Sequence, residues 1–366
     1  MRGLCYAVQQ SGLVLVGLAL LVTTSVAQEF ANVEYLCADW GPAMTLPAKT
    51  NEAPQFSGTD EEIYFVKQVT RFTRRKMVVP DPLSDSKTED IGHGVSIYLC
   101  KMKPDGSNKT EISELWANPR YPIDTQAQTT WMSLNQKTRK IALAIVIGGE
   151  DITGLWTINL DGSGLTRIQK PSMEEGGWSG FNNPSWTTDG QWIVFGKGVR
   201  NPQGVTGGIA KCDPQGSNAI YVIRSSNGET PCVSPDGKTI VYGRIGDAKT
   251  GGLYLVDIDG KNVRQLLDPK GKPVSGTYPT WSPDGKRIFA ISAGIRDATS
   301  GERLVARRPL VQGRQGTCGW SHWGSPGFVG FTVGGILFTD SELREGKWIG
   351  PSHLAECPKP QESCRW

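Results

Sequence analysis

The stretch that decides the fold is WSPDGKRIFAIS, which begins at Trp281. Two earlier stretches resemble it, WTTDGQWIVFGKG from Trp186 and VSPDGKTIVYGRIG from Val233, so the three starting residues lie 47 and 48 residues apart. Each copy has an apolar start, a turn containing Asp-Gly and an alternating apolar run, which is the pattern of a β-hairpin. A period of this length is typical of a radial β repeat.

A second hairpin phrase recurs beside these copies: GLWTINLDGSGLTRI from Gly154, GGLYLVDIDGKNVRQLL from Gly251 and the weaker GGIAKCDPQGSNAIYVI from Gly207. The two phrases together predict four strands per repeat. One four-stranded sheet cannot bury both of its faces, whereas copies stacked in a ring can, and the ring leaves only short edges. The sequence therefore predicts an all-β chain folded as a β-propeller.

Six repeats can be placed, opening near residues 53, 131, 186, 233, 281 and 319. The length of residues 28–366 also fits seven blades, with the termini forming the last one, so six and seven both stay open. We expect residues 28–366 to be a single propeller domain whose ring is closed by its N- and C-terminal segments, NVEYLCADWGPAMTL and GKWIG. Trp131, Trp186 and Trp281 are predicted to hold equivalent buried positions.

Residues 1–27 have the features of a secretory signal peptide: an early arginine, an apolar run at 12–22, and the small residues Ser25 and Ala27 before the expected cut. The alternative is a membrane anchor, but the apolar run is much shorter than the roughly 20 residues that span a bilayer. We therefore expect an extracytoplasmic protein, in a periplasm or similar compartment, without a membrane anchor.

Composition and motifs argue against several kinds of ligand. The net charge is only +3, with basic and acidic residues interspersed, so no nucleic-acid partner is expected. The chain has three histidines and no Cys-x-x-Cys-His motif, which predicts no metal site and no covalently bound haem. Seven cysteines remain after the signal peptide; Cys357 and Cys364 are spaced to close a small loop, and the others are expected to be buried apolar residues.

The candidate site lies on one face of the expected disc. The Asp-Gly turns should lie together on one face, and the long connections on the other, at residues 71–94, 148–153, 197–207, 244–252, 293–301, 169–184 and 311–320. Long loops on a rigid scaffold commonly carry binding sites. We predict a partner-binding surface with no catalytic residue, formed by Arg244, Asp247 and Lys249, by Trp178 and Phe181, and by Trp320 and His322. An alternative is sugar binding or hydrolysis by acids such as Glu174 and Glu175 beside aromatic rings.

The Pro-x-Trp-Ser-Pro-Asp-Gly-Lys pattern from Pro279, with its relatives at Pro184 and Pro231, resembles the TolB-type propeller repeats. An exported propeller of this length is more narrowly similar to the β subunit of anammox hydrazine synthase. That resemblance implies a non-catalytic subunit of a redox complex, in the anammoxosome lumen, with haem c only on its partner subunits. The alternatives are a stand-alone periplasmic TolB-like scaffold that binds proteins, and a carbohydrate-binding or lyase propeller.

Overall fold

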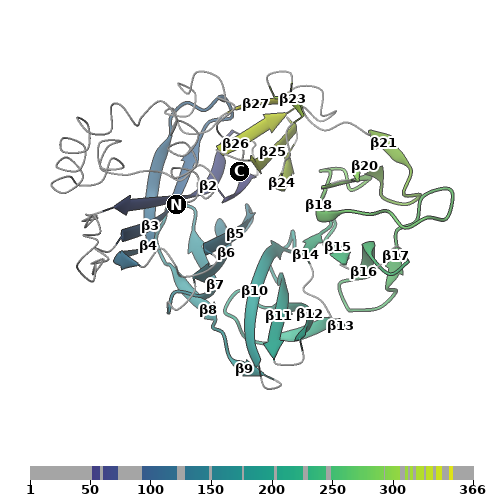
Figure 1. Cartoon of the computed structure of the whole chain (residues 1–366), viewed down its shortest axis with the longest axis horizontal. Coiled ribbons are helices and arrows are strands. Elements are labelled where there is room, and N and C mark those ends of the chain that lie inside the picture. The colour runs from purple at the N-terminus through teal and green to yellow at the C-terminus, as the bar shows by residue number, and fades with distance from the viewer. Residues whose placement is uncertain are drawn as a thin grey trace, which may run out of the picture. The chain divides into compact units, whose positions relative to one another are not determined.

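The computed structural model describes residues 52–57, 61–72, 93–121, 128–147, 151–174, 177–201, 204–225, 230–244, 249–291, 293–305, 310–311, 314–315, 319–324, 327–332, 335–339 and 346–348. All regular structure in these residues is β (Figure 1). The chain divides into two compact units. The larger unit comprises residues 46–68, 97–116 and 125–366, and the smaller one includes residues 69–96 and 117–124. The signal peptide predicted at residues 1–27 lies outside the described residues.

The described strands form six sheets, numbered here in chain order, and five of them have their successive strands side by side. Sheet 1 contains β1 (Glu52–Phe56), β2 (Ile63–Phe72), β3 (His93–Met102) and β4 (Thr110–Tyr121). Sheet 2 contains β5 (Gln128–Asn135), β6 (Lys140–Ile147), β7 (Gly154–Asn159) and β8 (Thr166–Gln169). Sheet 3 contains β9 (Met173–Glu174), β10 (Gly177–Trp186), β11 (Ile193–Asn201), β12 (Gly204–Cys212) and β13 (Ile220–Ser225).

The remaining sheets continue this order, although the last one is more complex. Sheet 4 contains β14 (Thr230–Val233), β15 (Thr239–Arg244), β16 (Gly252–Asp257) and β17 (Arg264–Gln265). Sheet 5 contains β18 (Thr277–Trp281), β19 (Arg287–Ile291), β20 (Gly294–Asp297) and β21 (Arg303–Val305). Sheet 6 contains β22 (Leu310–Val311), β23 (Arg314–Gln315), β24 (Gly319–Gly324), β25 (Gly327–Thr332), β26 (Gly335–Thr339) and β27 (Gly346–Trp348).

Apolar side chains fill the space between consecutive sheets of the larger unit. Leu155 of sheet 2 packs in one cluster with Phe195 of sheet 3, and Val194 on the other face of sheet 3 packs with Ile240 of sheet 4. The first strands contact one another in chain order, from β5 to β10, β14, β18 and β24, and β1 contacts both β5 and β24. Each sheet therefore buries its apolar residues against its neighbours, as predicted for a stack of repeats.

Glycines bring the third-to-fourth-strand turns of the sheets against the outer strand of the preceding sheet. A Cβ at Gly216, whose φ is +83°, would lie 2.0 Å from the carbonyl oxygen of Ile168. A Cβ at Gly260 would lie 2.3 Å from the carbonyl oxygen of Val222 in β13, and one at Gly301 would lie 2.2 Å from that of Leu267, two residues after β17. Only glycine allows so close a main-chain approach together with a positive φ.

The prediction that Trp131, Trp186 and Trp281 hold equivalent positions was wrong. In β10 and β18, Trp186 and Trp281 pair with Ile193 and Ile288, at the end of the strand beside the turn. In β5, Leu134 holds this position, since it pairs with Ile141, whereas Trp131 lies further from the turn. The pairing predicted between GKWIG and the N-terminal segment NVEYLCADWGPAMTL stays a prediction, because the N-terminal segment lies outside the described residues; Gly346–Trp348 pairs with β26 and β22.

Two connections that were predicted to be loops contain strands instead. Residues 197–201 and 204–207 belong to β11 and β12, which stay paired as far as Asn201 and Gly204. Residues 293–301 contain β20 and a tight turn. The interior of connection 71–94 lies outside the described residues.

Candidate functional site

Each of sheets 2 to 5 has two ends, which we call the turn end and the connection end. Sheet 4 serves as the example. The turn end carries the hairpin turns at Asp236-Gly237 and Asp259-Gly260, and the connection end carries the link from Arg244 to Gly252.

Aspartates at the turn end stabilise the turns themselves. The Ser234 hydroxyl donates to Asp236 Oδ1 at 2.5 Å, and the Lys238 N–H donates to the same oxygen at 3.0 Å. Asp284 in sheet 5 and Asp189 in sheet 3 accept the same pair of bonds. These hydrogen bonds favour the charged form and lower the pKa of Asp189, Asp236 and Asp284. The repeated aspartates are therefore turn residues.

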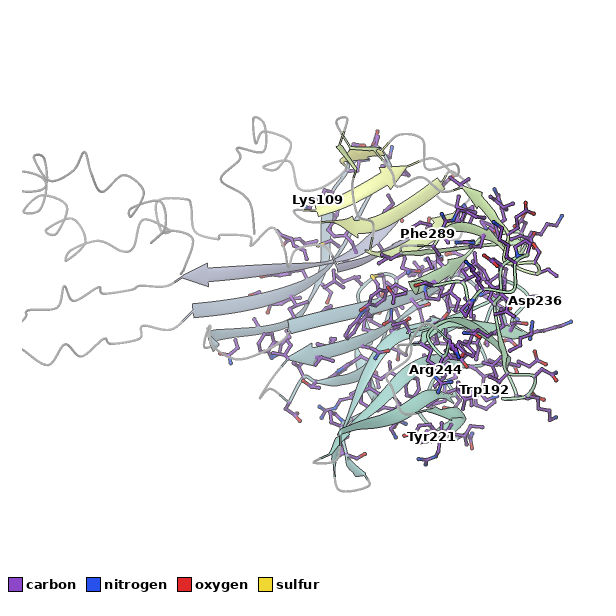
Figure 2. All side chains as sticks on the ribbon, turned by 45° about the vertical axis from the view of Figure 1, so that its right-hand side comes forward. Lys109, Trp192, Tyr221, Asp236, Arg244 and Phe289 are labelled. Atoms are coloured by element: carbon purple, nitrogen blue, oxygen red, sulfur yellow. The ribbon has the colours of Figure 1, made fainter. Side chains whose placement is uncertain are left out.

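The connection end of sheet 4 has a different construction. Arg244, the last residue of β15, is partly buried, and its guanidinium lies over the Tyr254 ring at 5.6 Å from the centroid (Figure 2 labels Arg244). The Tyr254 hydroxyl donates to the carbonyl oxygen of Thr250 at 3.0 Å. Gln265 Nε2 donates to the carbonyl oxygens of Lys249 and Gly251, both at 3.0 Å. The second half of this connection is thus fixed by side chains of β16 and β17.

At the connection end of sheet 2, a cation also lies over an aromatic ring. The Arg167 guanidinium lies 5.2 Å from the Trp156 ring centroid, and Trp156 Nε1 donates to the carbonyl oxygen of Ile152 at 2.8 Å. Here an acid is also present: Asp151 Oδ1 is 3.2 Å from Arg167 Nη1, and Asp151 Oδ2 is 3.3 Å from Nη2. The connection end of sheet 2 therefore carries an ion pair formed within the chain.

Sheet 3 forms a similar arrangement from other strands. Its third strand has Ala210 where sheet 4 has Tyr254, and Tyr221 of β13 pairs with this alanine. Lys197 and Arg224 lie over the Tyr221 ring, at 5.4 and 4.1 Å from its centroid. Three consecutive sheets thus present an aromatic ring with a cation at the connection end.

Charge separates the two ends of sheets 2 to 4 within the described residues. At the connection ends, the cationic residues whose side chains are described outnumber the acids: they are Arg167, Lys170, Lys197, Arg224, Arg244 and Lys249, against Asp151. The turn ends mix both signs, because most of their turns contain an aspartate. Among the described side chains of sheets 2 to 4, the connection ends therefore carry an excess of positive charge.

The structure brings few of the predicted site residues together. Arg244 and Lys249 flank one connection, and Asp247 between them lies outside the described residues. Trp178 is in strand β10, where it pairs with Arg200 and Met173; Trp320 and His322 are in β24, and the side chains of these three are not described. The prediction that Phe181 lies on a surface loop was wrong. It is 3% exposed and packs edge-to-face on Phe195, with centroids 5.7 Å apart.

Sequence reasoning missed the aromatic partners Trp156, Tyr221 and Tyr254. They occur within strands, so the pattern assigned them to the sheets. An aromatic residue two positions after the glycine that opens the third strand, as in Gly154-Leu155-Trp156 and Gly252-Leu253-Tyr254, is the signal that marks two of them.

Histidines, acids and cysteines were the other candidates for chemistry. Within the described residues, no group of three or more His, Cys, Asp or Glu side chains is placed to hold a metal ion. Glu174 is in β9, and Glu175 lies outside the described residues. Cys100 and Cys212 are buried and unpaired, and burial raises the pKa of both thiols to about 12. Cys357 and Cys364 also lie outside the described residues.

In the part of the chain that the structure describes, no helix is long and apolar enough to span a membrane.

Comparison with known proteins identifies the fold only. No family model matches the chain. A puromycin hydrolase structure is similar with a TM-score of 0.50 and 12% identity, covering 87% of this chain and 55% of that chain. TolB from Acinetobacter baumannii has a TM-score of 0.47 and 14% identity, covering 68% of this chain and 58% of that chain. Kuenenia stuttgartiensis hydrazine synthase has a TM-score of 0.39 and 12% identity, covering 68% of this chain and 84% of that chain.

This chain spans less than two thirds of the TolB and puromycin hydrolase chains. At these identities the likeness concerns the fold alone. Together with the repeated four-stranded antiparallel sheets, it gives the chain the general β-propeller fold.

Proposed function

We propose that this chain is an exported, non-catalytic β-propeller that binds a partner protein through the connection ends of sheets 2 to 4. The observation that carries this proposal is the connection end of sheet 4, where Tyr254 and Gln265 fix the main chain of residues 249–251 beside Arg244. A fixed connection loses little conformational entropy when a partner binds, which favours affinity. The excess of described cations on this surface supports an electrostatically steered association.

The scaffold in this proposal is a closed ring of six blades. The contacts of β1 with both β5 and β24 support closure, because they join the first and last sheets through strands of the larger unit. A rigid ring would hold the connection ends of neighbouring blades on one face, so several blades would contribute to one interface.

The partner in this proposal is a subunit of a redox complex, as the resemblance to the hydrazine synthase β subunit implies. Haem c would then belong to the partner subunits, and this chain would position them in an extracytoplasmic compartment.

Purification of the untagged native protein, followed by mass spectrometry of what accompanies it, tests this function. We expect stoichiometric partner proteins, with a haem stain on a partner band and none on this chain. A variant in which an Asn-Gly turn replaces residues 244–252 should keep the β-rich circular dichroism spectrum and lose the partner. Replacement of Asp236 by Asn at the turn end is the matched control and should retain the partner. A purified chain without partners, or an unchanged complex after the loop replacement, contradicts the proposal.

A further inference from the structure

The turn between the third and fourth strands has the same construction in sheets 1 to 4. Two main-chain hydrogen bonds close each turn; in sheet 1 they run from the Lys103 N–H to the Ser107 carbonyl oxygen and from the Gly106 N–H to the Lys103 carbonyl oxygen. Near its end, each turn has one residue with a φ between 53° and 68°: Asn108, Gly164, Asn218 and Asn262. The side chains at this position can therefore be compared on one backbone.

Sheets 3 and 4 use the asparagine at this position within the turn. Asn218 Nδ2 donates to Asp213 Oδ2 at 2.9 Å, and Asn262 Nδ2 donates to Asp257 Oδ2 at 2.6 Å. In sheet 1, Lys103 stands where sheets 3 and 4 have the aspartate. A lysine ammonium cannot accept a hydrogen bond, so the turn of sheet 1 offers its asparagine no such acceptor.

The Asn108 side chain is accordingly exposed, and no described residue bonds to its amide. The Thr110 hydroxyl donates to the Asn108 carbonyl oxygen at 3.2 Å, as Thr166 donates to that of Gly164 at 3.1 Å in sheet 2. The turn itself thus has a use for the threonine. It does not require an asparagine side chain, because glycine holds the same position in sheet 2.

Asn108-Lys109-Thr110 is also the only Asn-x-Ser or Asn-x-Thr sequence of the chain in which x is not proline (Figure 2 labels Lys109). This is the acceptor sequence for N-glycosylation, which modifies exposed turns of secreted proteins. We infer that Asn108 is an N-glycosylation site. The inference rests on the export in the proposed function, because it is exported chains that receive this modification.

The reaction joins Asn108 to an oligosaccharide that is carried on a polyprenyl diphosphate. Asn108 Nδ2 forms a bond to C1 of the first sugar and loses one proton, while the bond between C1 and the diphosphate oxygen breaks and the lipid diphosphate leaves with its electron pair. The folded turn can carry the product, because the Asn108 amide has no described hydrogen bond to lose and the adjacent residues 107, 109 and 110 are exposed.

The glycan would lie beside the turn end of sheet 2. An added Cβ at Gly162, in the equivalent turn of sheet 2, would lie 2.7 Å from Ile112 Cγ2 in β4, a few residues after Asn108. The turns of sheets 1 and 2 are therefore neighbours, and a glycan on Asn108 would leave the connection ends of sheets 2 to 4 accessible to a partner.

Mass spectrometry of peptides from the untagged native protein tests this site. We expect the peptide that contains Asn108 to carry a glycan, which peptide:N-glycosidase releases. A peptide found only in its unmodified form overturns the inference. The N-terminal peptide of the same sample separates this failure from that of the proposed function: a chain that still contains residues 1–27 contradicts export, whereas a chain cut after Ala27 agrees with export and lacks only the glycan.

Variants expressed in the native host test the acceptor residues. Asn108→Gly should abolish the modification and keep a denaturation midpoint close to wild type, because the turn of sheet 2 already has Gly164 at this position. Thr110→Ala should also abolish it, and Thr110→Ser should retain it. Asn218→Gly, at the same turn position of sheet 3, is the matched control and should leave it unchanged. A glycan that persists in Asn108→Gly or Thr110→Ala, or is lost in Asn218→Gly, overturns the site.

The same variant separates the glycan from partner binding. Asn108→Gly should keep the native partner, because the turn lies away from the connection ends. Loss of the partner together with the glycan would contradict the connection ends as the binding surface, while the modification of Asn108 would stand.

Discussion

The two ends of sheet 4 use their charged residues in opposite ways. At the turn end, Asp236 accepts hydrogen bonds from its own turn, and Lys261 pairs with Asp259 at 2.9 Å. At the connection end, Arg244 lies over Tyr254, and no described acid pairs with it. The first hairpin turn recurs with the same aspartate bonds in sheets 3, 4 and 5, whereas the connection end differs in each of sheets 2 to 4. Repetition therefore indicates where the chain stabilises itself, and the varied connection ends are where we propose that it binds a partner.

The largest expected effect concerns the core beneath the connection end. Phe181→Ala should lower the free energy of unfolding by about 3–5 kcal/mol, since it removes a buried ring that packs on Phe195. Urea denaturation measures this loss. A change in the free energy of unfolding below about 1 kcal/mol would contradict the burial of Phe181 in the core and would favour a surface position.

The turn end can be broken at a single glycine. Gly216→Ala should cost about 3 kcal/mol or more, because a positive φ is unfavourable for alanine and the new Cβ meets the Ile168 carbonyl oxygen. Gly271 is the matched control, with φ +73° and nothing within 4 Å of an added Cβ. Gly271→Ala should cost only about 1–2 kcal/mol, the conformational part alone. Equal losses in thermal or chemical denaturation would refute a main-chain contact between sheets 2 and 3.

Hydrogen bonds between sheets provide a smaller test. The Val233 N–H of sheet 4 donates to Ser185 Oγ of sheet 3 at 2.9 Å, and both groups are buried. Ser185→Ala leaves this N–H without its acceptor and should cost about 1–3 kcal/mol. Ser163→Ala, in an exposed turn of sheet 2, should stay within about 0.5 kcal/mol. Denaturation midpoints of the two variants that do not differ would argue against this contribution to sheet packing.

The smallest effect is the acid sensitivity of the turn end. Because the folded-state pKa values of Asp189, Asp236 and Asp284 are lowered, their stabilising contribution is complete above the ordinary aspartate pKa of about 3.9 and is lost as the pH falls through the folded values. A variant with Asn at all three positions should lack part of this loss between about pH 5 and 2.5. We expect a difference below about 1 kcal/mol, since solvent screens these exposed groups. Parallel stability curves for wild type and variant across this range would contradict the turn role of the aspartates.

Much of the fold was predictable because its turns are local. Asp-Gly pairs define a hairpin within a few residues, and the positive φ values of Gly190, Gly237 and Gly285 agree with that prediction. The strand β10 was not predictable, because its Asn-Asn-Pro sequence resembles a loop. A register shift between Asn182 and Ser185, with φ +43° at Asn183, accommodates these residues within the strand. The position of Trp131 was predicted wrongly because it is a tryptophan like Trp186 and Trp281. It lies further from its hairpin turn than they do.

The candidate site was only partly predictable for a different reason. Arg244 and Lys249 could be found because their connection is longer than a hairpin requires. Their partners Tyr254 and Gln265 could not, because a tyrosine and a glutamine in alternating strands have no sequence feature that separates a loop-fixing role from packing. The equivalence of sheets 2 and 4 becomes visible only when cross-strand partners are known.

The glycine contacts between sheets also bear on how such a chain can change over time. Where Gly216, Gly260 and Gly301 reach the carbonyl oxygens of the preceding outer strand, adjacent sheets meet through atoms that every amino acid shares. The spacing at these points depends on the absence of a side chain at each glycine, and not on which side chain the carbonyl residue carries. A duplicated repeat would therefore dock on its parent through the same atoms, and a repeat can exchange its surface residues without altering the distance to the next. A repeat that keeps this glycine could therefore be duplicated, and its surface residues could diverge, without a change in the contact between sheets.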